Sequence, residues 1–157
     1  MEEIQLANKY EALAWICKNQ LGRRNLSPER KKFLLGKEYE STKLAVGGQP
    51  GNCNKVNRCD QNDHIDSEKR TCERIAVEHG VGSATVRRAE KYSRGIDAAE
   101  EAVPGAQEEI LTGHIKATDE QIVALASIPK EERPAILEEL KKKKSDRDDT
   151  VLERLKL

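Results

Sequence analysis

The stretch from 71 to 94 limits the fold more than any other part of this chain. It reads T-C-E-R-I-A-V-E-H-G-V-G-S-A-T-V-R-R-A-E-K-Y-S-R, with apolar residues at helical spacing on both sides of Gly80. Because glycine adopts a positive φ readily, Gly80 can end a first helix sharply and let a second one begin. The pattern therefore predicts a helix-turn-helix. The residues expected to face inward are Ile75, Ala76, Val86 and Ala89.

The second helix of this unit is expected to carry cations on its outward side. Ser83 has the side chain of an N-cap residue, and small hydroxylated residues followed by cations suit a helix that enters the major groove. The residues expected to contact DNA are Ser83, Thr85, Arg87, Arg88, Lys91 and Arg94, with Arg23, Arg24, Lys31 and Lys32 at the flanking phosphates. Two short helices joined by a glycine turn also occur in proteins that never meet DNA, and this alternative stays open.

Charge is unevenly distributed along the chain, although the formal net charge is zero. Residues 18–94 contain 17 Lys and Arg against 10 Asp and Glu, whereas residues 95–140 contain 3 against 11. Because phosphate contacts supply much of the affinity for nucleic acids, the basic part favours a polyanion as its partner. The acidic part suits a solvated surface or a docking site for a partner protein. A helical protein–protein interaction module acting through residues 95–140 is therefore the alternative function.

The composition restricts the size of the core. Charged residues make up 36% of the chain and aromatic residues 3%, so we expect a small all-α bundle that contains the helix-turn-helix, followed by further short helices. No apolar run reaches the roughly 20 residues of a membrane span, and the acidic start is unlike a secretory signal. We therefore expect a cytoplasmic, nucleoid- or plasmid-associated protein with reduced thiols.

Helix start and stop signals divide the first part of the chain into two regions. Residues 1–22 are expected to hold an N-terminal amphipathic helix, and residues 23–95 the DNA-binding region with a flexible loop at 46–66. Ser27 and Pro28 predict the start of a helix that runs to about Leu44. The apolar stripe of the N-terminal helix includes Ile4, Ala7, Leu13, Ala14, Ile16 and Cys17. Ser67 or Thr71 is the expected cap of the helix that precedes Gly80.

The remaining chain is expected to form an acidic helical region, residues 96–144, and a tail or helical extension, residues 145–157. The segment that begins at Gly95 should loosen the helix before it, and Pro104 should break that helix or begin another. A short helix is expected at 106–111. Thr118 and Gln121 have the spacing of a capping box, and Pro134 is tolerable because it falls in the first turn of a helix over 131–143.

Several segments, taken in order, resemble the helical region that follows the ParB-type nuclease-like domain in phage and plasmid proteins related to ParB partition factors and KorB-like regulators. They are N-Q-L-G-R-R-N-L-S-P-E-R at 19–30, F-L-L-G-K-E-Y at 33–39, the Gly-rich loop, residues 71–88, and I-L-T-G-H-I-K-A-T-D-E-Q-I at 110–122. The resemblance implies an all-helical module that binds double-stranded DNA in plasmid partition or transcription regulation. It also implies that the DNA-reading helix spans residues 83–94. The nuclease-like domain itself is absent, so we expect a truncated homologue or a fragment.

The sequence offers one metal hypothesis. Cys53, Cys59, His64 and Cys72 provide four ligands for a tetrahedral zinc ion, but they lack a closely spaced cysteine pair, and unpaired thiols in a reducing compartment are the alternative. No other pattern points to an active site, so we expect no enzyme and no cofactor. Because a single helix-turn-helix usually acts with a second copy, we expect a homodimer that forms through the N-terminal or C-terminal helices.

Overall fold

A computed structural model describes residues 7–45, 71–142 and 149–156, whose regular secondary structure is entirely helical. The helices are α1 (Lys9–Leu21), α2 (Pro28–Ala45), α3 (Thr71–His79), α4 (Ser83–Ala102), α5 (Ala106–Leu111), α6 (Asp119–Leu125), α7 (Arg133–Lys141), α8 (Asp149–Leu152) and the 3₁₀ helix η2 (Glu153–Lys156). The expected all-α bundle is confirmed. The loop expected at 46–66 and the alternative cap Ser67 lie outside the described residues. None of the described helices is both long and apolar enough for a membrane span.

Three of the predicted start signals act as expected. The Ser27 hydroxyl accepts a hydrogen bond from the Arg30 N–H at 3.2 Å, and α2 begins at the next residue. The Thr118 hydroxyl accepts from the Gln121 N–H at 3.3 Å, while the Gln121 side chain accepts from the Thr118 N–H at 3.0 Å, which completes the capping box at α6. Pro134 lies in the first turn of α7, where no intrahelical hydrogen bond needs its missing N–H.

Helix α1 differs from the expected amphipathic helix. Asn8 caps it by accepting from the N–H groups of Tyr10 and Glu11, and only Cys17 is buried. Leu13 and Ile16, which the sequence pattern placed on the apolar stripe with Cys17, are each 47% exposed. The reason is that α1 packs mainly along one side of α2, which covers a narrower strip than the apolar residues occupy.

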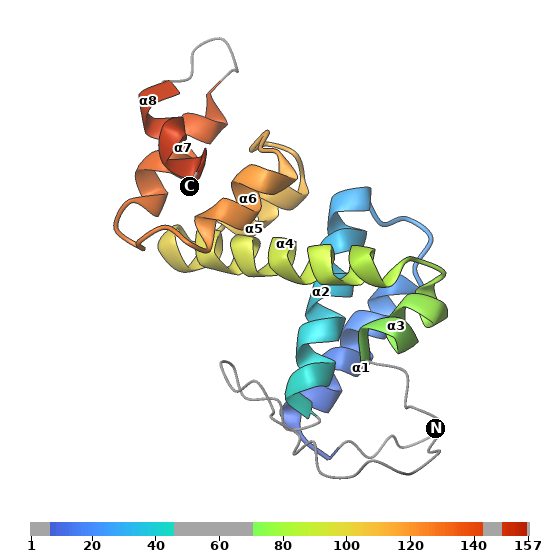
Figure 1. Ribbon diagram of the computed structural model, residues 1–157. Helices are drawn as coiled ribbons and strands as arrows, with labels where there is room; N and C mark the ends of the chain where they lie inside the picture. Colours follow the sequence, from blue (N-terminus) through green and yellow to red (C-terminus); the bar gives the residue numbers. More distant parts are fainter. Residues whose placement is uncertain (1–6, 46–70, 143–148, 157) are drawn as a thin grey trace.

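Two hydrophobic clusters share α4, which crosses the whole molecule in Figure 1 with α1–α3 at one end and α5–α8 at the other. The smaller cluster joins α2, α3 and the first half of α4 and consists of Leu35, Cys72, Ile75, Ala76, Val86 and Ala89. The larger one joins the second half of α4 to α5–α7 and η2, with Tyr92, Ile96, Ile110, Ile122, Leu125, Ile136, Leu137, Leu140 and Leu155 among its members. Helix α4 therefore ties the two ends of the molecule together.

The expected loosening of the helix at Gly95 is wrong, because α4 continues without a break to Ala102. Gly95 is a contact point: a Cβ atom there would lie 2.0 Å from the carbonyl oxygen of Ile122. Its missing side chain lets α6 approach the backbone of α4, and the packing outweighs the low helix propensity of glycine. Pro104 does mark the end of the helix as predicted, since Val103 is the C-cap of α4.

The last described segment joins the core. Helix α8 and η2 follow α7, with Leu155 only 8% exposed and Val151 and Leu152 partly buried against the larger cluster. Of the two expectations for residues 145–157, a tail or a helical extension, the structure describes a helical extension over 149–156.

Candidate nucleic-acid interface

A tight turn joins α3 to α4. Gly80 has a φ of 65°, the left-handed conformation expected from the sequence. The Val81 N–H donates to the Ala76 carbonyl at 2.9 Å and the Gly80 N–H donates to the Val77 carbonyl at 3.3 Å, the hydrogen-bond pattern of a Schellman motif. These bonds satisfy the last carbonyls of α3 and turn the chain within three residues.

The cap of α4 is Gly82, so the expected N-cap role of Ser83 is wrong. Gly82 has extended backbone angles, its carbonyl accepts from the N–H groups of Thr85 and Val86, and Ser83 is already the first helical residue. No side chain accepts a hydrogen bond at this cap. The Ser83 hydroxyl therefore lies half-buried on the first turn instead of closing it.

The inward faces of α3 and α4 agree with the prediction. Ile75 and Ala76 pack against Val86 and Ala89, and all four side chains are at most 4% exposed. Leu35 of α2 completes the cluster, and Leu21 at the end of α1 packs against it. The end of α1 and the Arg23 and Arg24 that follow it are thereby held close to the α3–α4 unit.

Helix α4 presents a basic outward face over its first turns. Thr85, Arg87, Arg88 and Lys91 are exposed. The Arg87 guanidinium donates to the Cys72 sulfur at 3.6 Å, a weak interaction that holds the side chain along α3. The side chains of Arg88 and Lys91 form no hydrogen bond or ion pair with any residue that the structure describes. The one acid between 83 and 94 is Glu90, which is 9% exposed and turned away from this face.

Two of the expected DNA-binding residues form ion pairs with acids of the same chain, although the Arg94 side chain remains 51% exposed. Arg94 donates to the Glu90 carboxylate at 2.8 Å and to Glu40 at 3.3 Å. Lys32 forms an ion pair with Asp119, and its ammonium lies 4.7 Å from the centre of the Tyr92 ring. Both cations are therefore neutralised by the chain itself. The other flanking cations, Arg23, Arg24 and Lys31, are exposed.

The acidic residues after position 94 are paired to a larger extent than their sequence pattern predicted. Ion pairs join Lys37 to Asp97, Arg30 to Glu108, Lys130 and Arg133 to Glu101, and Lys141 to Glu109. Those of Lys37 and Arg30 connect basic α2 to the acidic region, because α2 crosses α4 and begins beside α5. The paired side chains of Asp97, Glu101, Glu108 and Glu109 remain 40–64% exposed, so the acidic face is solvated as expected and in addition paired with cations of the chain.

A buried acid–imidazole pair joins α2 to α3, and sequence reasoning missed it. The Glu38 carboxylate, 5% exposed, lies 2.7 Å from the His79 Nε2 and joins α2 to the last turn of α3. Burial raises the pKa of Glu38, an effect that His79 partly opposes. Glu78 completes a trio whose ligand atoms lie within 4.8 Å of one another, but the ammonium of Lys18 already contacts Glu78. The two carboxylates of the trio therefore already have partners in the protein, His79 for Glu38 and Lys18 for Glu78.

The cysteines give no support to the zinc set within the described residues. Cys72 lies in the first turn of α3, is 3% exposed and packs in the smaller cluster, while Cys53, Cys59 and His64 lie outside the part of the chain that the structure describes. Cys17 is buried between α1 and α2, and burial raises the pKa of its thiol to about 11. Both described cysteines are free thiols.

Comparison of the chain with protein-family models, curated proteins and solved structures finds no match.

Proposed function

We propose that this protein binds double-stranded DNA through α3, the turn at Gly80 and α4, in the manner of ParB-like and KorB-like partition or transcription-regulatory proteins. The observation that carries the proposal is the outward face of α4, where Arg87, Arg88 and Lys91 are exposed and Glu90, the one acid between 83 and 94, is buried. Such a face suits entry of the helix into a major groove, with arginine donating to guanine edges or phosphates.

The packing supports this use of α4. Helix α3 and the smaller cluster hold the first turns of α4 rigidly, and the exposed Arg23 and Arg24 follow closely on Leu21, which packs against that cluster. Cations on a separate segment beside the reading helix suit contacts to the flanking phosphates. Because Lys32 and Arg94 are paired internally, we assign the interface to Thr85, Arg87, Arg88, Lys91, Arg23, Arg24 and Lys31, with Ser83 at its edge.

The alternative, a docking module acting through residues 95–140, has less support. It requires free carboxylates, and Asp97, Glu101, Glu108 and Glu109 are all in ion pairs. An acidic surface that its own chain neutralises offers less attraction to a basic partner.

The proposal is tested by measuring affinity against salt for a mixed-sequence duplex of about three helical turns, roughly 30 base pairs. We expect Arg87→Ala/Arg88→Ala to weaken binding and to lower the slope of log K against log salt by about one for each phosphate that the variant no longer neutralises. A matched control, Lys116→Ala/Lys130→Ala, removes two positive charges from the other end of the molecule and should bind like the wild type. An equal weakening in both variants, or no binding by the wild type at low salt, would refute the proposal.

A further inference from the structure

Three metal-binding side chains meet where the end of α3 packs against α2. Glu38 of α2 and Glu78 and His79 of α3 each offer one ligand atom, and the three atoms lie within 4.8 Å of one another. No other group of three His, Cys, Asp or Glu residues comes together in this way in the part of the chain that the structure describes. One imidazole nitrogen and two carboxylate oxygens are donors that zinc accepts in proteins.

The packing holds two of these donors in place before an ion binds. The Glu38 side chain is 5% exposed and that of His79 is 20% exposed, with Oε2 of Glu38 2.7 Å from Nε2 of His79. Neighbouring donors on a tetrahedral zinc ion lie roughly 3.3 Å apart, so this pair needs only a small separation to bind one. The proton that the pair shares then passes to solvent. Glu78, whose side chain is 37% exposed, is free to turn toward the ion.

The surroundings of Glu38 lack positive charge. Burial and the nearby Glu78 raise the pKa of Glu38, and the opposing effect of His79 does not restore it to its usual value. A divalent cation at this point would supply the missing charge, since a buried carboxylate is costly unless it is paired or coordinates a metal.

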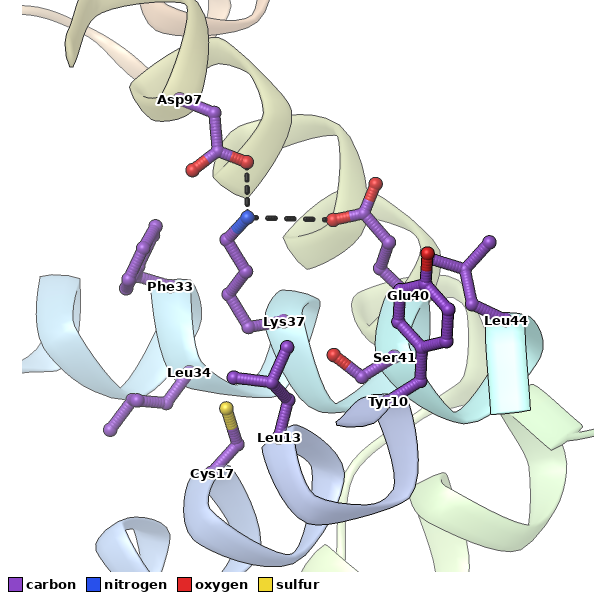
Figure 2. Close-up of a pocket in the computed structure, with 10 residues that line it drawn as sticks. All are labelled: Tyr10, Leu13, Cys17, Phe33, Leu34, Lys37, Glu40, Ser41, Leu44 and Asp97. Carbon is purple, nitrogen blue, oxygen red and sulfur yellow. Dashed lines mark hydrogen bonds and ion pairs between the residues drawn. The ribbon is translucent and has the colours of Figure 1, made fainter. Parts of the chain in front are cut away.

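One cation of the protein competes for the site. The Lys18 ammonium contacts Glu78, but the Lys18 side chain is 54% exposed, and exposed ion pairs of this kind are weak. The cation next to Glu38 in the sequence is directed elsewhere, because Lys37 reaches Asp97 of α4, as Figure 2 shows. Lys18 is therefore the group that limits the affinity for a metal ion.

We propose that Glu38, Glu78 and His79 bind a zinc ion, and that Lys18 pairs with Glu78 when the ion is absent. Zinc with three protein ligands keeps a fourth position for water, which suits the exposed side of the site at Glu78. The bound ion links α2 to the last turn of α3, directly before Gly80, and so stabilises the fold. This role is additional to the proposed DNA binding and does not depend on it.

The test is isothermal titration calorimetry of the reduced, chelator-treated full chain with zinc chloride, without DNA. We expect Glu78→Gln to weaken zinc binding by about tenfold or more, because it removes a ligand. Glu73→Gln removes the same charge from α3 outside the site and should bind zinc like the wild type. The wild type and the Cys53→Ser/Cys59→Ser chain should bind zinc with the same affinity at this site, since neither cysteine is a ligand.

Lys18→Gln should change the affinity in the opposite direction. It frees Glu78 from its competing partner, so zinc should bind more tightly than in the wild type. Lys9→Gln removes the same charge from the other end of α1 and is the matched control. A merely structural role of the trio gives no reason for zinc affinity to rise in Lys18→Gln above that of Lys9→Gln.

Circular dichroism verifies that each variant keeps its fold, which the exposure of Lys18 and Glu78 favours. As a second readout, zinc should raise the midpoint temperature of unfolding in the wild type but not in Glu78→Gln. Equal zinc binding by Glu78→Gln and the wild type overturns the proposal, and so does a Lys18→Gln variant that binds no more tightly than Lys9→Gln. Zinc binding that disappears in Cys53→Ser/Cys59→Ser would assign the metal to the cysteines and also overturn it. Because no DNA is present, failure of this proposal is separable from failure of the DNA-binding function.

Discussion

Gly36 of α2 lies against the backbone of Ala89 in α4, so closely that a Cβ atom at position 36 would be 2.1 Å from the Ala89 carbonyl oxygen. This close approach is the crossing point of the two helices. It lies beside Arg87, Arg88 and Lys91, the exposed cations of α4. Gly95 makes a similar approach to Ile122 of α6. The two glycines thus allow α2 and α6 to pack closely against α4 at two separate points.

Substitution of either glycine by alanine should destabilise the fold. The added methyl group would overlap a backbone carbonyl that cannot rotate away, so helix α2 or α6 must move outward. We expect the free energy of unfolding to fall by about 1–3 kcal/mol or more for Gly36→Ala and for Gly95→Ala. Urea denaturation measures this change. The matched control is Gly22→Ala, where the nearest atom would be 3.5 Å away and φ is −70°, and stability should be unchanged or slightly higher.

The capping box of α6 should contribute measurably to stability. Thr118→Ala removes the acceptor for the Gln121 N–H, and we expect the free energy of unfolding to fall by about 1 kcal/mol. Thermal denaturation tests this expectation. Thr85→Ala, on the exposed side of α4, removes the same side-chain atoms but leaves the helix caps intact. The midpoint temperature of its thermal unfolding should therefore be nearly that of the wild type. Similar effects of the two substitutions would contradict the assigned role of Thr118.

Glu100 should make the stability depend on acid pH. The pKa of Glu100 is lowered because its carboxylate accepts hydrogen bonds from the backbone N–H groups of Gly105 and Gln107. A lowered folded-state pKa means that the stabilisation is present above the unfolded-chain value of 4.5 and is lost as the pH falls through the folded-state value. Glu100→Gln should therefore be less stable than the wild type at neutral pH.

Urea denaturation at a series of pH values measures this dependence. The difference in stability between wild type and Glu100→Gln should be constant near neutral pH and shrink in acid. Glu131→Gln removes an exposed carboxylate with no such backbone hydrogen bond among the described residues, and its curve should follow that of the wild type. A difference that is independent of pH would show that the charge of Glu100 is not responsible.

Arg94 and Lys91, three residues apart on α4, should differ in their effect on DNA binding. Arg94 is paired with Glu90 and Glu40, whereas Lys91 forms no ion pair within the described residues. We expect Lys91→Ala to weaken binding and to lower the salt slope by about one, and Arg94→Ala to leave both nearly unchanged. Fluorescence anisotropy with the mixed-sequence duplex compares the two. An equal weakening by Arg94→Ala would mean that its ion pairs open on binding.

The basic and acidic parts of the chain illustrate what sequence reasoning could not reach. Counting charges predicted a basic surface and a separate acidic one, because the count follows position along the chain. In the fold, α2 crosses α4 and begins beside α5, which brings Lys37 to Asp97 and Arg30 to Glu108. Several of the opposite charges therefore neutralise each other. Gly95 was misjudged for a related reason: its low helix propensity is visible in the sequence, and its close approach to Ile122 is not.

What the sequence by itself determined is local. The Ser27 and Thr118 caps, the turn at Gly80, the end of α4 near Pro104 and the inward faces of α3 and α4 depend on residues within a turn or two of each other, so their side-chain chemistry suffices. Only the tertiary structure decided which cations of α4 remain without an ion pair among the described residues. It also decided that Leu13 and Ile16 of α1 stay exposed. Both outcomes depend on residues that are distant in the sequence. They become neighbours only because α2 packs against α1 and crosses α4.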